Sequence, residues 1–104
     1  MSAVVVTAVF TPLPGKESAL VDALRACLPA IHEEPGCIYY TLNGAEDGRV
    51  VMVEKWASRA DLDAHDVSPG TQALRAAIAD LVAAPVAVEF LTPIPAGTAE
   101  QGAL

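Results

Sequence analysis

Apolar residues follow two spacings along this chain, and the spacings predict four strands alternating with helical segments. Runs rich in valine and aromatic residues, bounded by Pro, Gly or acidic turns, are typical of strands. Apolar residues that recur every three or four positions are typical of amphipathic helices. Strands are predicted over residues 4–10, 37–43, 49–56 and 86–91, a long helix from 16 to about 31, a short helix to about 66, and a last helix from 69 to 85.

Local signals mark where these elements begin and end. Pro29 lies within the long helix and should kink its last turn or end the regular helix there. Ser58 is a predicted helix N-cap, with Asp61 as its capping-box-like partner. Ser68-Pro69 places a proline at the first position of the last helix. The Gly-rich acidic turn GAEDG joins the second and third strands into a hairpin.

The order of elements predicts an α+β fold, the ferredoxin-like β-α-β-β-α-β arrangement with an antiparallel sheet and helices on one face. The domain is assigned to residues 1–92, and residues 93–104, rich in Pro, Gly and Ala, to a C-terminal extension. Three strands are apolar on both faces, yet the helices cover only one of those faces. Because an apolar face needs a cover, we expect a homodimer whose two sheets pack face to face.

Composition and charge narrow the possible partners. The chain has 104 residues, 53% of them hydrophobic, and a net charge of −7 with six Lys and Arg. So few basic residues make nucleic acid and anionic membranes unexpected partners. The apolar run after Met1 is too short for a membrane span and lacks a basic leader, so a cytoplasmic location is expected. Cys27 and Cys37 are expected to be reduced thiols.

The third strand carries the first candidates for chemistry. Met52, Glu54 and Trp56 share one face, because side chains alternate along a strand. Burial would raise the pKa of Glu54 unless a cation or a donor meets it. Glu54 is therefore either a pocket acid or base, or a carboxylate satisfied by hydrogen bonds or an ion pair. Trp56 is either a core anchor or an apolar pocket wall with one N–H donor.

Histidine and tyrosine residues extend the candidate set. His65 follows Leu62 by three positions and shares its helix face, so it is either a proton-transfer residue at a pocket rim or a structural histidine. Tyr39 and Tyr40 must point to opposite faces of the sheet, and the pattern leaves open which faces the helices. His32, beside two glutamates, is expected in solvent. Neither a phosphate-binding Gly-rich loop nor a metal-ligand spacing is present, so we predict neither cofactor nor metal.

Three stretches, EPGCIYYTLN, RVVMVEKWASRADLDAH and SPGTQAL, closely resemble the antibiotic biosynthesis monooxygenase superfamily of dimeric α/β barrels. The resemblance covers about residues 4–91. It implies a pocket between sheet and helices, where Glu54, Trp56 and His65 match family residues. Many relatives carry a histidine and an aromatic residue after the S-P element, where this chain has Gly70 and Thr71. The haem-degrading branch needs residues that are missing here, so haem is not expected.

The resemblance and the residues together predict a cofactor-independent monooxygenase acting on a small electron-rich aromatic, such as a quinol or a polyketide-like phenol. His65 or Glu54 would take a proton from the substrate. A non-enzymatic small-molecule binding protein and an isomerase-type proton-transfer enzyme remain the alternatives. The residues expected to contact the substrate are Trp56, Tyr39, Tyr40, Met52 and Leu62.

Overall fold

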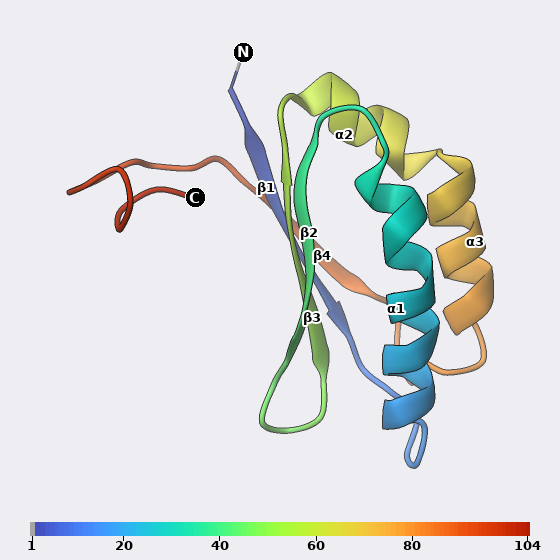
Figure 1. Ribbon diagram of the computed structural model, residues 1–104. Helices are drawn as coiled ribbons and strands as arrows, with labels where there is room; N and C mark the ends of the chain where they lie inside the picture. The colour runs from blue at the N-terminus through green and yellow to red at the C-terminus, as the bar shows by residue number, and fades with distance from the viewer. Residues whose placement is uncertain (1) are drawn as a thin grey trace.

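The computed structural model describes residues 2–104 and confirms the predicted α+β, ferredoxin-like fold. Its four strands form one antiparallel sheet in the order β2-β3-β1-β4. All helices lie on one side of this sheet, and the C-terminal segment leaves on the other side (Figure 1). The elements are β1 (Val4–Phe10), α1 (Glu17–His32), β2 (Cys37–Gly44), β3 (Val50–Trp56), α2 (Arg59–Asp66), α3 (Pro69–Ile78) and β4 (Ala87–Leu91).

The two predicted helix starts are confirmed by their caps. The Ser58 hydroxyl oxygen accepts from the Asp61 backbone N–H at 3.1 Å, and the Ser68 hydroxyl oxygen accepts from the Thr71 N–H at the same distance. Each bond satisfies an N–H that has no partner within its own helix. Pro69 occupies the first turn of α3, as expected. These caps fix where α2 and α3 begin.

One predicted helix end is wrong. Helix α3 ends at Ile78 rather than near Pro85, because the following residues pair with the segment after β1: Val82 forms a bridge with Pro12, and Leu13 N–H donates to Leu81 O at 2.8 Å. Helix α1 continues past Pro29 to His32, close to its predicted end at about residue 31, so Pro29 does not terminate it. Ile31, which is fully buried in the core, anchors that last turn against the sheet.

A bulge in β2 decides which tyrosine faces the helices. Cys37 pairs with Trp56 and Tyr39 with Lys55, so Ile38 is an extra residue in β2. The extra residue re-aims the side chains that follow it. Tyr40 therefore lies opposite Glu54 on the helix side and is buried, whereas Tyr39 lies on the outer face.

The core lies between the inner face of the sheet and the helices. Helix α1 contributes Leu20 and Leu24, which pack with Met52 and Trp56 of β3, and all four have an exposed fraction of 0%. Burial of one such apolar side chain stabilises a fold by roughly 1.5–3 kcal/mol. These side chains bury the inner face of β3 beneath α1, and the predicted alternation of β3 is confirmed.

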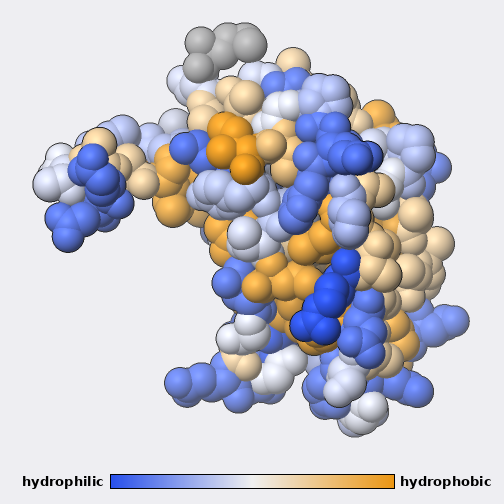
Figure 2. Space-filling view, in the orientation of Figure 1, coloured by the Kyte–Doolittle hydropathy of each residue, from blue (hydrophilic) through white to orange (hydrophobic). Residues whose placement is uncertain are grey.

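The outer face of the sheet is less well covered. Val9, Val51 and Val53 are half-buried there, and every residue of β4 is exposed. Residues 93–104 contain turns but no helix or strand, and part of this tail forms a shallow hollow with Val5 and Leu91. Apolar side chains reach the surface of the domain body, and the tail projects from it (Figure 2). Within residues 2–104, no helix combines the length and apolarity needed to cross a bilayer.

Candidate active site

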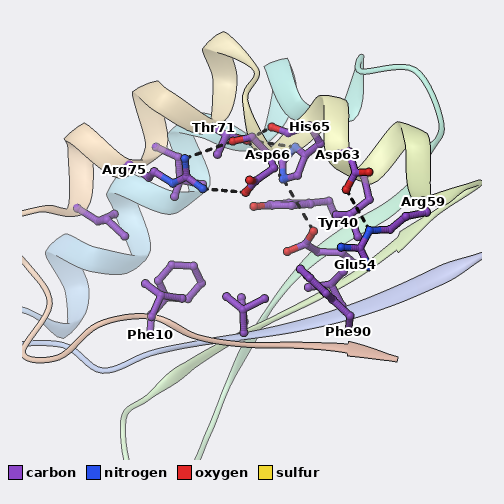
Figure 3. A pocket seen from close by; sticks show the side chains of 17 residues that line it. Phe10, Tyr40, Glu54, Arg59, Asp63, His65, Asp66, Thr71, Arg75 and Phe90 are labelled. Carbon is purple, nitrogen blue, oxygen red and sulfur yellow. Dashed lines mark hydrogen bonds and ion pairs between the residues drawn. The ribbon is translucent and has the colours of Figure 1, made fainter. Parts of the chain in front are cut away.

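A cavity of about 390 Å³ opens between the inner face of β1 and β4 and the helices α2 and α3 (Figure 3). This volume falls within the range of small-molecule pockets. Most of its wall is apolar, whereas one end carries ionisable side chains. The apolar wall consists of Val6, Ala8, Phe10, Leu62, Leu74, Ile78, Val86, Val88 and Phe90.

The polar end of the cavity is built around His65 and Glu54. His65 comes from the last turn of α2 and is 7% exposed, and Glu54 comes from β3 and is 4% exposed. Their nearest atoms, His65 Nε2 and Glu54 Oε1, are 3.9 Å apart. Figure 3 shows the two side chains pointing toward each other across the cavity. An imidazole and a carboxylate so placed can pass a proton between them, or to and from a bound ligand.

The Glu54 carboxyl group lies in an environment that disfavours its charge. Burial raises its pKa, and the nearby Glu34 adds to that effect. Two interactions oppose the rise: the hydrogen bond from Trp56 and the attraction of His65. The net direction is upward, so the folded protein holds the pKa of Glu54 above the ordinary value of 4.5.

Aromatic rings pack around the histidine. The Trp56 ring stacks on the His65 ring with centroids 4.4 Å apart, and Tyr40 meets His65 edge-on with centroids 5.4 Å apart. The Trp56 Nε1–H also donates to Glu54 Oε1 at 2.9 Å. Burial raises the pKa of the Tyr40 hydroxyl, and the charge of Glu54 raises it further, so Tyr40 remains a neutral donor beside the cavity. These contacts leave the imidazole little freedom to rotate.

The structure adds a residue to the site that the sequence reasoning missed. Glu34, in the turn after α1, lies with Oε1 2.8 Å from His65 Nδ1, and its Oε2 accepts from the Ser68 hydroxyl at 3.0 Å. The sequence offered one signal, since Glu34 begins the EPGC stretch quoted above. The acidic pair of Glu33 and Glu34 beside His32 is otherwise typical of solvated charges at the end of a helix.

Two ion pairs form the rim of the cavity. Arg59 Nε lies 3.0 Å from Asp63 Oδ1 on α2, and Arg75 Nη2 of α3 lies 2.8 Å from Asp66 Oδ1. The Arg59 guanidinium also lies over the Phe90 ring, 4.6 Å from its centroid, and so links α2 to the edge strand β4. The rim charges are exposed and balanced, so they give the mouth no excess of one sign.

The structure brings some of the predicted site residues to the cavity and places others elsewhere. His65, Glu54, Tyr40 and Leu62 line it. Trp56 and Met52 are fully buried behind that surface, so neither forms the substrate-contacting wall expected of it. Tyr39 lies on the opposite face of the sheet, and its buried hydroxyl has no hydrogen-bond partner within residues 2–104. His32 is exposed, as expected, and its Nε2 lies 2.9 Å from Tyr40 O.

The remaining candidates for chemistry lie outside the cavity. Cys27 and Cys37 are free thiols and half-buried, and burial raises the pKa of Cys37. Within the part of the chain that the structure describes, no three His, Cys, Asp or Glu side chains are grouped so that they could hold a metal ion. Glu34, Glu54, His65 and Tyr40 are the side chains at the site that can transfer protons or form hydrogen bonds.

Fold and site together define an α+β, ferredoxin-like protein with a small-molecule pocket between sheet and helices, polar at one end. The chain belongs to the antibiotic biosynthesis monooxygenase family, whose sequence model matches residues 3–77. This confirms the resemblance drawn from the sequence.

Individual relatives agree with this assignment. The chain is 39% identical over 94 residues to the Mycobacterium tuberculosis protein named "Putative monooxygenase Rv0793", a match that covers 89% of this chain and 93% of that protein. The solved structure of Rv0793 superimposes with a TM-score of 0.84 at 38% identity, covering 93% of this chain and all of that one (100%). SO0527 of Shewanella oneidensis gives a TM-score of 0.79 at 33% identity, covering 86% of this chain and 89% of that one.

Proposed function

We propose that this protein is a cofactor-independent monooxygenase that oxidises a small electron-rich aromatic compound, such as a quinol or a polyketide-like phenol. The observation that carries the proposal is the pairing of His65 Nε2 and Glu54 Oε1 at 3.9 Å, at the polar end of an otherwise apolar cavity. Membership of the family and the name of the Mycobacterium tuberculosis relative support an oxygenase-type reaction. The apolar wall suits an aromatic ring, and the polar end suits its hydroxyl group.

In this proposal the substrate supplies the electrons and the protein supplies a base in a dry site. His65 takes the phenolic proton, and the electron-rich ring anion then reacts with O₂ at carbon. The resulting carbon–hydroperoxide loses water, so that one oxygen atom stays on the ring as a carbonyl and the other leaves in water. Glu54 takes up or returns a proton, and Tyr40 donates a hydrogen bond to a substrate oxygen.

Oxygen uptake by the purified protein tests this function. A panel of dihydroxynaphthalenes and anthrones is offered to protein freed of flavin and treated with a chelator. We expect uptake of one O₂ per product, a product 14 mass units heavier than the substrate (one O gained and two H lost), and one labelled atom in the product from ¹⁸O₂. His65→Gln should lose most of the activity. His32→Gln is the matched control, because it removes the other histidine, which lies outside the cavity.

Three results would overturn the proposal. No uptake across the panel, together with thermal stabilisation by a panel compound, would make the protein a binding module. A product with the mass of the substrate would make it an isomerase-type enzyme. Uptake that His65→Gln leaves unchanged would remove the histidine from the reaction.

We also propose that the protein acts as a homodimer in which the outer faces of two sheets meet. The half-buried valines on that face, and the apolar tail side chains Ile94 and Leu104, which are 85% and 59% exposed, support this arrangement. A chain of this size buries only part of its apolar surface by itself. A second copy of the chain would cover the outer face of the sheet, which the helices do not reach.

A further inference from the structure

We infer that Glu34 is a positioning residue for His65, and that it fixes which nitrogen of the imidazole faces the cavity as a base. The part of this inference that concerns catalysis rests on the proposed function. The part that concerns the histidine tautomer rests on the hydrogen bonds of Glu34 alone. Glu34 Oε1 lies 2.8 Å from His65 Nδ1, on the side of the ring away from Glu54. Glu34 itself is absent from the described residues that line the cavity.

The chemistry of the contact sets the tautomer of the histidine. An ionised carboxylate can only accept a hydrogen bond, so Nδ1 must carry the proton and donate it to Glu34. In neutral imidazole the other nitrogen is then unprotonated. Nε2, which points to Glu54 and the cavity, is therefore left as the proton acceptor. As the ring takes up a proton from a substrate, the adjacent carboxylate also stabilises the developing positive charge.

Several contacts hold Glu34 in place. Its second oxygen accepts from the Ser68 hydroxyl at 3.0 Å, while the same Ser68 oxygen caps α3. The Thr71 hydroxyl donates to His65 O at 2.7 Å and ties the start of α3 to the end of α2. Glu34 thus links the turn after α1 to both following helices. Its side chain is only 15% exposed, so solvent screens these hydrogen bonds less than at the surface.

Gly70 leaves the space that Glu34 occupies. A Cβ atom at position 70 would lie 3.0 Å from Glu34 Oε2 and 3.3 Å from Ile31 Cγ1, both closer than most real contacts of this kind. A larger residue would push on the carboxylate from behind. Gly70→Ala is therefore a second way to disturb Glu34 without removing it. Gly44→Ala is its matched control, because a Cβ at Gly44 meets nothing within 4 Å.

The test combines ¹⁵N NMR of the imidazole with steady-state kinetics. Wild-type protein should show His65 with a protonated Nδ1 and an unprotonated Nε2 near neutral pH. Glu34→Ala should shift the ring toward a mixture of tautomers and lower kcat by about tenfold to a hundredfold, the loss typical when a hydrogen-bonded support behind a histidine is removed. The KM should change little, since Glu34 does not line the cavity. Glu33→Ala, which removes the exposed neighbouring carboxylate, should change neither property.

The two readouts separate this inference from the proposed function. Should the panel show no oxygen uptake, the NMR result alone still decides whether Glu34 sets the tautomer. An unchanged His65 spectrum in Glu34→Ala would overturn the inference even with full activity in the wild type. If that variant does not fold, Gly70→Ala takes its place, with an altered tautomer ratio expected and the Gly44→Ala spectrum unchanged. If Gly70→Ala and Gly44→Ala gave the same His65 spectrum, the inference that Glu34 sets the tautomer would be contradicted.

Discussion

The indole of Trp56 lies almost parallel to the imidazole of His65, with ring centroids 4.4 Å apart and planes inclined by 28°. The same indole donates its N–H to Glu54 Oε1 at 2.9 Å. One fully buried side chain therefore supports both members of the proposed proton-transfer pair. Its role is to hold the polar end of the cavity from beneath, where a ligand cannot reach it.

Replacing Trp56 with Phe should destabilise the fold by about 2–4 kcal/mol, because the change leaves a partly empty core site and a buried carboxyl group without its donor. The pKa of Glu54 should rise further, since the Trp56 hydrogen bond lowers it. Urea denaturation measures the loss of stability. Tyr39→Phe is the matched control: its buried hydroxyl has no partner within residues 2–104, so its removal should be neutral or slightly stabilising. A Trp56→Phe protein as stable as wild type would contradict this account.

Glu54 should make stability depend on pH with a defined sign. Its pKa is raised in the folded protein above the ordinary value of 4.5, so the folded state binds the proton more tightly than the unfolded state. The stability from this group is fully present below about pH 4.5 and is lost as the pH rises through the folded pKa. Glu54→Gln keeps a hydrogen-bond acceptor for Trp56 but cannot ionise, so the variant should not lose this stability as the pH rises.

The free energies of unfolding of Glu54→Gln and wild type are to be compared at pH 4 and pH 8. The variant's advantage in unfolding free energy should grow from pH 4 to pH 8, because only the wild type must deprotonate a buried carboxyl group over this range. Glu46→Gln, at an exposed site in the hairpin, supplies the control and should show a nearly constant difference. A Glu54→Gln advantage that shrinks as pH rises would show that the carboxylate is the favoured form in the fold.

Phe90 should matter more for ligand binding than for folding. Its ring is 53% exposed, lines the cavity and lies under the Arg59 guanidinium. Phe90→Ala should weaken binding of a dihydroxynaphthalene by roughly tenfold, from lost apolar contact, and cost about 1 kcal/mol or less in stability. Calorimetric titration measures the affinity. Leu91→Ala, next in sequence but on the opposite face of β4, should bind as wild type does; equal losses in both variants would refute a specific role for Phe90.

The homodimer proposal predicts that a charge at the centre of the outer sheet face separates the subunits. Val53→Asp places a carboxylate among half-buried valines, where pairing with a second sheet would bury it unpaired. Light scattering after gel filtration should give a dimer mass for wild type and a monomer mass for the variant, with folding checked by circular dichroism. Ala26→Asp adds the same charge on the exposed side of α1 and should remain dimeric. A wild-type monomer at micromolar concentration would contradict the proposal.

The sequence predicted those parts of the fold that depend on neighbours in the chain. Strict alternation placed Met52, Glu54 and Trp56 on one face, and short capping signals located the starts of α2 and α3. The end of α3 could not be read in the same way, because it depends on pairing with residues near Pro12. Which of Tyr39 and Tyr40 faces the helices depends on the bulge at Ile38, for which the sequence carries no clear signal.

The candidate site shows the same division. Glu54 stands out as a carboxylate within an apolar strand, and His65 as a proton-transfer residue on the helix face of Leu62. Glu34 did not, because the turn after α1 is a common place for a solvated glutamate and its partner is 31 residues further along the chain. Helix α2 packs against the turn that carries Glu34, and this packing makes the Glu34 carboxylate a largely buried hydrogen-bond acceptor.

The two ends of the cavity are built on different parts of the fold. Its polar end is built on the central strand β3, the short helix α2 and the turn after α1, all tied together by buried hydrogen bonds. Its opposite wall includes Val88 and Phe90 of β4, an edge strand whose residues are all exposed. Substitutions on that strand can reshape the pocket without disturbing the hydrogen-bonded half. The shape of the pocket can therefore be redesigned one β4 side chain at a time while its hydrogen-bonded end stays the same.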